Sequence, residues 1–224
     1  MDALLRRRAM IATGGSPTPP PTPTPEFYDY LYFDGVAYID TDITPPTDFS
    51  IRFGMGKETN KAAQRVFACL AANSTSCGML YNSSTTSTNR SIAVYYGTSG
   101  TATTARTLAF STDSFQFFLT PNKFGFGNTS YNITKGANAP SGPLTFGSNP
   151  SHSGNPFSGR IATIRIYDST AQNATSPADL LNNYTQMYTL KPCKYNGEDG
   201  LWCEELSKFY GNTAGAGTLT ASNS

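Results

Sequence analysis

Apolar and polar residues alternate along most of the chain after Phe27, which is the pattern of half-buried antiparallel strands. The apolar members of the four clearest windows are Phe49, Ile51, Phe53 and Met55; Ile92, Val94 and Tyr96; Phe115, Phe117 and Leu119; and Ala162, Ile164 and Ile166. Clusters of Ser, Thr, Asn, Gly and Pro lie between them and mark turns. Many short strands at this spacing predict an all-β fold, an antiparallel β-sandwich or jelly roll.

Two shorter windows refine this prediction. Residues 177–183 (PADLLNN) place a Pro at the first turn of a helix-forming stretch, which predicts the one helix of the domain. The phrase at 38–41 (YIDT) predicts an edge strand with Ile39 buried. Asp40 and Thr41 would then be available to satisfy a turn.

The first 12 residues (MDALLRRRAMIA) are a short helix candidate that is too short to hold a helix alone in water. One interpretation is a frayed tail. The other is an anchoring arm that grips a partner through apolar side chains and presents three arginines to an acidic groove. The contact residues expected of that arm are Leu4, Leu5, Arg6, Arg7, Arg8, Met10 and Ile11.

Residues 13–25 (TGGSPTPPPTPTP) form a linker between this arm and the sandwich, which occupies residues 26–224. Gly14 and Gly15 give a flexible joint. The six prolines from Pro17 to Pro25 favour an extended polyproline II path, and at ~3.1 Å per residue this path makes a spacer of roughly 28 Å. A disordered low-complexity leader is the alternative interpretation.

Charge and hydropathy exclude several classes of protein. Residues 1–25 carry three Arg and one Asp, and the remainder carries 13 Lys/Arg and 14 Asp/Glu, so the sandwich offers no general attraction for nucleic acid. No run of apolar residues approaches the ~20 that span a bilayer, so we expect no membrane insertion. The apolar stretch after Arg8 is too short for a secretory signal, and we expect the chain to begin uncleaved in a cytoplasm.

The chain has four cysteines, Cys69, Cys77, Cys193 and Cys203, and none has the spacing of a zinc site. Cys69 could bridge to Cys77 across a hairpin, and Cys193 could bridge to Cys203. Without an export signal, free thiols are the favoured interpretation.

Three segments together resemble a known family. They are YLYFDGVAYIDTDI at 30–43, SGRIATIRIYD at 158–168, and PCKYNGEDGLWCEELSKFYGNTAGAGTLT at 192–220. They resemble the opening and closing phrases of laminin-G-like, concanavalin A-like sandwich modules of Bacteroides, their phages and prophages, over about residues 27–221. The sequence departs from the family at Trp202, Cys203 and Leu219, where the family has Tyr, Asp and Phe.

The glycines of the closing phrase have a physical interpretation of their own. We predict that Gly200 permits a tight turn into Leu201 and Trp202. We predict that Gly211, Gly215 and Gly217 adopt the positive φ that a hairpin return requires. All these residues build the scaffold and none of them is catalytic.

The arm, the linker and the sandwich together are similar to phage structural proteins. The resemblance implies a virion protein assembled in the cytoplasm of a bacterial host: a capsid decoration, head fibre or tail-associated protein. Its arm would bind other virion proteins, and its sandwich would be displayed outward, with adhesion to host or mucosal glycans and a homo-oligomer as further expectations.

No catalytic centre is predicted. A sandwich glycosidase needs two carboxylates about 5–9.5 Å apart, and the adjacent pairs Glu198–Asp199 and Glu204–Glu205 do not have the spacing for it. The only histidine, His152, lies in a loop and is expected to be solvated. We assign no metal or other cofactor: Ca²⁺ is compatible with such sandwiches, but its candidate ligands Asp40, Asp42 and Asp48 are expected to cap turns.

A sugar would be bound by exposed aromatic rings beside hydrogen-bonding side chains. The candidates are Tyr95, Tyr96, Tyr131, Tyr195 and Trp202, of which we select Tyr95, Tyr96 and Trp202. The long loops at 82–89 and 97–104 are the expected binding surface. The alternatives are a bacterial surface carbohydrate-binding module and a sandwich glycoside hydrolase.

Overall fold

The structure is a computed structural model that describes residues 23–57, 64–69, 77–83, 89–97, 104–109, 115–152 and 156–223. For residues 57, 77–83, 89–91 and 104–109 it describes the backbone alone. The predicted arm at 1–12, and all of the predicted linker except its last three residues, lie outside this description.

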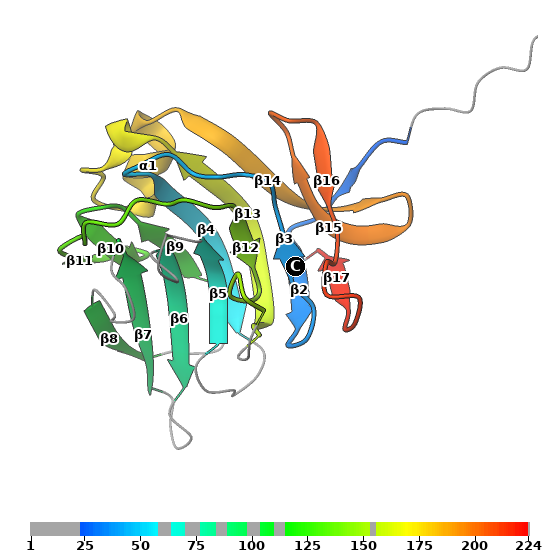
Figure 1. The fold of residues 1–224 in the computed structure, drawn as a ribbon, viewed down its shortest axis with the longest axis horizontal. Helices are drawn as coiled ribbons and strands as arrows, with labels where there is room; N and C mark the ends of the chain where they lie inside the picture. The colour runs from blue at the N-terminus through cyan, green and yellow to red at the C-terminus, as the bar shows by residue number, and fades with distance from the viewer. Residues whose placement is uncertain are drawn as a thin grey trace, which may run out of the picture.

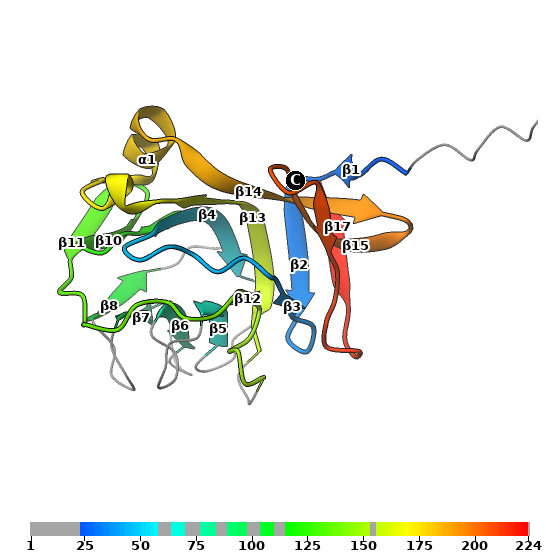
Figure 2. The ribbon, with the colours of Figure 1, turned by 45° about the horizontal axis from the view of Figure 1, so that its top comes forward.

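The chain folds into two antiparallel sheets that face each other, which confirms the predicted all-β sandwich (Figures 1 and 2). The larger sheet has the strand order β11-β10-β9-β4-β13-β14-β15-β16, with β2 on β13, β17 on β2 and β1 on β14. Its strands are β1 (Glu26–Phe27), β2 (Tyr30–Asp34), β4 (Ser50–Lys57), β9 (Phe115–Leu119), β10 (Lys123–Phe126), β11 (Thr129–Asn132), β13 (Ser158–Tyr167), β14 (Gln186–Tyr195), β15 (Glu198–Cys203), β16 (Lys208–Tyr210) and β17 (Leu219–Ser222).

The smaller sheet has the order β3-β12-β5-β6-β7-β8. Its strands are β3 (Ile39–Asp40), β5 (Gln64–Cys69), β6 (Cys77–Ser83), β7 (Asn89–Tyr96), β8 (Thr104–Ala109) and β12 (Leu144–Phe146). β3 is an edge strand with Ile39 fully buried, as the YIDT phrase predicts.

The main core lies between the two sheets, where the alternating apolar residues of both meet. Phe53 of β4 contacts Phe67 of the opposite sheet edge to face, with ring centroids 5.8 Å apart. It also contacts Phe117 of β9 at 5.0 Å. Phe49, Ile51 and Met55 are buried with it. The periodic windows therefore identify the core strands correctly, because alternate side chains of a strand point to one face.

One residue of the predicted core strands, Ala162, does not lie in the core. The pairing of β13 with β4 shifts between Ile161 and Ile164, so three residues of β13 span two of β4. This bulge puts Ile161 and Ile164 into the core and turns Ala162 to the outer face. There Ala162 lies beside Gly54, where an added Cβ would come within 2.8 Å of it.

The predicted helix is present as α1 (Pro177–Asn183), and it covers one end of the outer face of the larger sheet with the 3-10 turn η1 (Ser169–Ala171) (Figure 2). The hydroxyl of Ser176 caps α1 by accepting the amide of Asp179 at 3.0 Å. The cap and the buried Leu180 fix the helix against the sheet. The cluster beneath it consists of Phe118, Tyr167, Ala171, Ala174 and Leu180.

The C-terminal strands extend beyond the sandwich (Figure 1). β14 pairs with β13 through its first half and with β15 through its second half. Asn196 and Gly197, both at positive φ, make the two-residue turn between β14 and β15. Gly215 and Gly217 adopt positive φ as predicted. Gly211 does not.

Candidate functional site

The outward face of β14, β15 and β16 carries a group of half-buried aromatic side chains. Lys191 lies opposite Trp202, and Trp202 lies opposite Phe209, so these three side chains share one face. The ring of Tyr195 is 5.3 Å from that of Trp202 and 5.5 Å from that of Phe209, measured between centroids. We call Phe27, Tyr195, Trp202 and Phe209 the aromatic patch.

Gly200 lies directly beneath the ring of Phe209 in this patch. A Cβ built on Gly200 would lie 2.7 Å from the ring of Phe209 and 2.3 Å from the carbonyl oxygen of Tyr210. Both distances are shorter than real Cβ contacts, so no side chain fits there. The prediction that Gly200 forms a tight turn is therefore wrong: the residue lies inside β15, and the ring above it requires the glycine.

One edge of the patch is charged. Phe27, which is 46% exposed, lies under the ammonium group of Lys191, 5.3 Å from Nζ to the ring centroid. The same ammonium pairs with Glu204 at 2.5 Å. The patch therefore combines the exposed ring of Phe27 and three half-buried rings with an ion pair at its edge.

Cys193 lies on the same face, opposite Phe27 and Gly200, and is fully buried. Burial, together with the charge of Asp199, raises the pKa of the Cys193 thiol to about 12. Cys203 lies opposite Leu190 on β14. Because Leu190 and Cys193 are an odd number of positions apart on that strand, the side chains of Cys193 and Cys203 point to opposite faces of the sheet. The expectation of free thiols is confirmed for Cys193 and Cys203.

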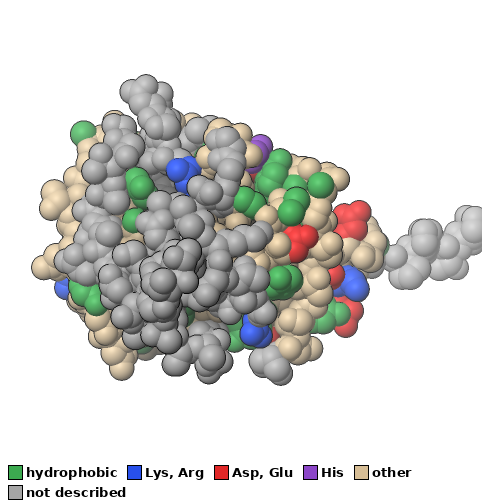
Figure 3. All heavy atoms as spheres, turned by 90° about the horizontal axis from the view of Figure 1, so that it is seen from below, with side chains coloured by type: hydrophobic (Ala, Val, Ile, Leu, Met, Phe, Trp, Pro, Cys, Tyr) green, Lys and Arg blue, Asp and Glu red, His purple; other side chains and the backbone are tan. Residues whose placement is uncertain are grey.

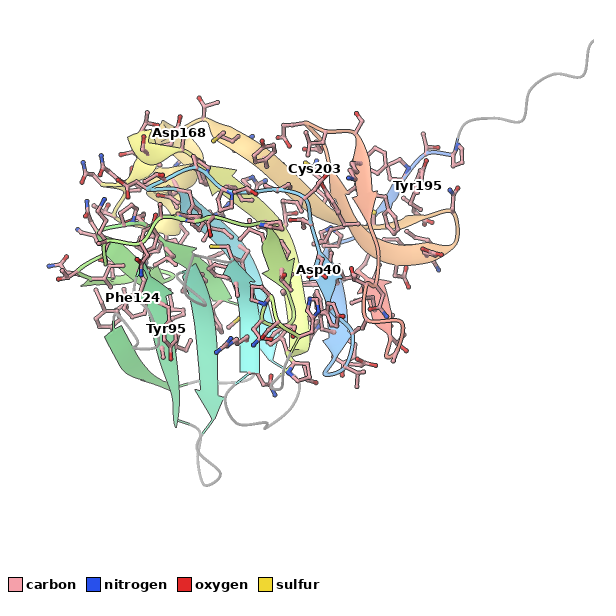
Figure 4. The ribbon with its side chains drawn as sticks, in the orientation of Figure 1. Asp40, Tyr95, Phe124, Asp168, Tyr195 and Cys203 are labelled. Carbon is pink, nitrogen blue, oxygen red and sulfur yellow. The ribbon has the colours of Figure 1, made fainter. Side chains whose placement is uncertain are left out.

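The structure does not bring the other selected ring residues to the patch. Tyr96 is a core residue: it is 2% exposed, its hydroxyl donates to the carbonyl of Phe49 at 2.6 Å, and its ring stacks on Phe49. Its selection as a surface residue was wrong, because the alternation of β7 points it inward. Tyr95 is half-buried on the smaller sheet, and Figure 4 shows it far from Tyr195. Most of the loops at 82–89 and 97–104 lies outside the described residues.

His152 lies in a loop and is exposed, as predicted, but its side chain also has partners. Its Nε2 lies 3.0 Å from each carboxylate oxygen of Asp40, and its ring stacks on Tyr38 with centroids 4.1 Å apart. Thr145 donates a further hydrogen bond to Asp40 at 2.7 Å. These contacts attach the loop before β13 to the edge strand β3. The sequence does not reveal this structural role, because His152 and Asp40 are 112 positions apart.

The other two calcium candidates, Asp42 and Asp48, also bind distant segments, although they were expected to cap turns. Asp42 accepts hydrogen bonds from Lys208, at 2.5 Å, and from Tyr210. Asp48 pairs with Lys135 at 2.7 Å. In the part of the chain that the structure describes, no three His, Cys, Asp or Glu side chains gather as a metal site would require. Figure 3 shows a few charged side chains of each sign on one face, with the acidic ones on its right side.

Half of the patch is predictable from the sequence. Trp202 is one of the residues selected above and Tyr195 is one of the wider candidates, but Phe27 and Phe209 are in neither set. The signal for Phe209 was its alternation with Tyr210, which is buried at 6% exposure on the opposite face. For Phe27 the sequence holds no such signal, because β1 joins the sheet through a contact with β14 more than 160 positions away.

No protein-family model and no curated protein matches this sequence. Among solved structures, a native heptameric SAP-like pentraxin from Limulus polyphemus is similar to it, with a TM-score of 0.51 and 10% sequence identity. The match covers 83% of this chain and 95% of that chain. At this identity the match shows the fold alone, an antiparallel β-sandwich. The origin in Bacteroides phages stays a prediction. Of the described helices, none has the length and apolar character needed to cross a membrane.

Proposed function

We propose that this protein is a non-enzymatic, glycan-binding display protein whose aromatic patch holds a sugar ring. The observation that carries the proposal is the convergence of Tyr195, Trp202 and Phe209 over Gly200 on strands that extend beyond the sandwich. These rings are half-buried and already packed against one another, so they lose little side-chain freedom when a ligand stacks on them.

The carboxylates near the patch support a binding role over a hydrolytic one. Glu204 is paired with Lys191. Glu205 accepts the amide of Thr189 at 2.6 Å. Glu198 and Asp199 are neighbours on β15, so their side chains point to opposite faces. A retaining or inverting glycosidase requires two carboxylates that face one groove.

We further propose that the protein is a virion component: residues 1–12 attach it to other proteins of the particle, the linker acts as a spacer, and the sandwich presents the patch outward. The support is the resemblance of the leader and of the opening and closing phrases to phage structural modules. Homo-oligomerisation is part of this proposal.

A glycan array probed with the full chain tests the binding role. We expect bound glycans, loss of binding in Trp202→Ala, and unchanged binding in Tyr95→Ala, which alters the rival aromatic residue on the smaller sheet. Binding that survives in Trp202→Ala and disappears in Tyr95→Ala would contradict the patch. Sugar release above the buffer background would contradict the non-enzymatic assignment.

Deletion of residues 1–12 tests the attachment. We expect the deleted chain to lose co-purification with particles while its unfolding transition stays unchanged. Full retention on particles would contradict the arm.

A further inference from the structure

Two arginines lie directly opposite each other on the outer face of the larger sheet. Arg52 of β4 pairs in register with Arg165 of β13. Their other neighbours across the sheet are Phe118 on β9 and Thr189 on β14. Side chains that face each other in this way start about 5 Å apart, and like charges in such a pair are destabilising.

Neither guanidinium has a carboxylate within ion-pair distance among the described residues. Glu205 reaches Thr189, but it accepts the backbone amide there at 2.6 Å and lies 3.6 Å from the Cys203 Sγ. Both arginines are half-buried. Burial, and then the neighbouring Arg165, lowers the pKa of Arg52, and Tyr167 opposes that effect. A desolvated pair of like charges is costly without a counter-charge.

Polar atoms without partners surround the two arginines. Of the seven buried side-chain atoms of the described residues that have no hydrogen-bond partner, four lie on this face: Ser50 Oγ, Arg52 Nε, Tyr167 OH and Thr189 Oγ1. Ser50 and Tyr167 are 0% exposed and pair in register, and Thr189 is 2% exposed. Buried polar groups nearly always have a partner, so four such atoms at one place need a partner that the described residues do not supply. We call Ser50, Arg52, Arg165, Tyr167 and Thr189 the arginine cluster.

We propose that the arginine cluster binds an oxyanion: a carboxylate, sulfate or phosphate group. The two guanidiniums supply forked N–H donors that match the oxygens of such a group. The hydroxyls of Tyr167 and Thr189 add neutral donors, and the anion supplies the counter-charge that no described carboxylate gives to Arg52 and Arg165.

The position of the cluster points to a source for the anion. Thr189 and Lys191 lie on the same side of β14, two residues apart, about 7 Å along the strand. Lys191 borders the aromatic patch. One glycan can therefore reach both places, with a sugar ring on the patch and an acidic group on the arginine cluster. This part rests on the proposed function, and it names the ligand as an acidic glycan that carries uronate or sulfate ester groups.

Thermal unfolding with inorganic sulfate tests the oxyanion site on the full chain. Sulfate raises the Tm of most proteins because it is excluded from their surface. The test therefore compares the sulfate-dependent gain in Tm between the wild type and variants. We expect the wild type to gain more Tm from sulfate than Arg165→Gln does, at ionic strength matched with chloride. The control Arg160→Gln, on the same strand outside the cluster, should keep the wild-type gain.

The anion-free state gives a second readout. Because Arg165→Gln removes a like-charge contact, its Tm without sulfate should equal or exceed that of the wild type. An equal sulfate gain in the wild type, Arg165→Gln and Arg160→Gln would overturn the site. So would a fall in the Tm of Arg165→Gln together with a retained sulfate gain.

Glycan binding then distinguishes the two sources of the anion. We expect Arg165→Gln to lose acidic oligosaccharides and keep neutral ones, and Trp202→Ala to lose both. A sulfate gain that depends on Arg165, with no glycan bound by any variant, would support the oxyanion site and overturn the acidic glycan as its ligand.

Discussion

The carboxylate of Asp34 accepts the backbone amide of Thr218, 184 positions later in the chain, at 2.6 Å. Its other oxygen accepts the amides of Val36 at 2.8 Å and Ala37 at 2.9 Å. Asp34 ends β2, and Thr218 precedes β17, which pairs with β2. One carboxylate therefore joins the opening phrase of the domain to its closing phrase.

Asp34→Asn should destabilise the fold, because an amide group cannot accept all three hydrogen bonds with the strength of a carboxylate. We expect a loss of about 1–3 kcal/mol in the free energy of unfolding, measured by urea denaturation. The control is Asp48→Asn, which removes only the exposed ion pair with Lys135 and should cost less than about 1 kcal/mol. Equal, small effects of the two substitutions would contradict the role of Asp34.

The same carboxylate should make stability depend on pH. Partial burial alone raises the pKa of Asp34, but the hydrogen bonds from Ala37, Val36 and Thr218 outweigh it and hold the pKa below its ordinary value. Its contribution is therefore present above the unfolded pKa of about 3.9 and is lost as the pH falls through the folded value. We expect the stability difference between the wild type and Asp34→Asn to shrink below about pH 4. A difference that stays constant from pH 7 to pH 3 would contradict this.

Gly200→Ala should disturb the aromatic patch. Its new methyl group would overlap the ring of Phe209 and the carbonyl of Tyr210, which we expect to cost about 1–3 kcal/mol. Trp202 is the only tryptophan, so its native emission reports the change directly. Gly54→Ala is the control, because its new methyl group crowds Ala162 and Gln116, which are not part of the patch. It should lower stability without shifting the emission. An unchanged emission spectrum in Gly200→Ala would argue against the close packing of the Phe209 ring on Gly200.

The Cys193 thiol should be unreactive in the folded protein. It is fully buried, and its pKa is raised to about 12 by burial and by Asp199, so the thiolate fraction at neutral pH is negligible. We expect iodoacetamide at pH 8 to leave Cys193 unmodified until urea unfolds the chain, as read by peptide mass spectrometry. Rapid labelling under native conditions would refute the buried position.

The strands and the helix could be predicted because their signals are local. The alternation around Ile51 and Phe53 and the Pro at position 177 each act within a few residues, and the structure has the corresponding β4 and α1. The pattern failed at Ala162, because the bulge after Ile161 turned this residue outward. The choice of Tyr96 as a surface residue failed for another reason: it alternates in step with Ile92 and Val94, and all three are buried in the core.

The sequence by itself determined the class of fold, the position of the core strands and Trp202 as a candidate for binding. Hydrophobic periodicity and turn residues carry that information, because side-chain direction follows from the local backbone. The tertiary structure decided which side chains meet. The pairings of Phe27 with Cys193, of Arg52 with Arg165 and of Asp34 with Thr218 depend on strand register between distant segments. Register arises from the packing of the whole sandwich, so no short window of the chain encodes it.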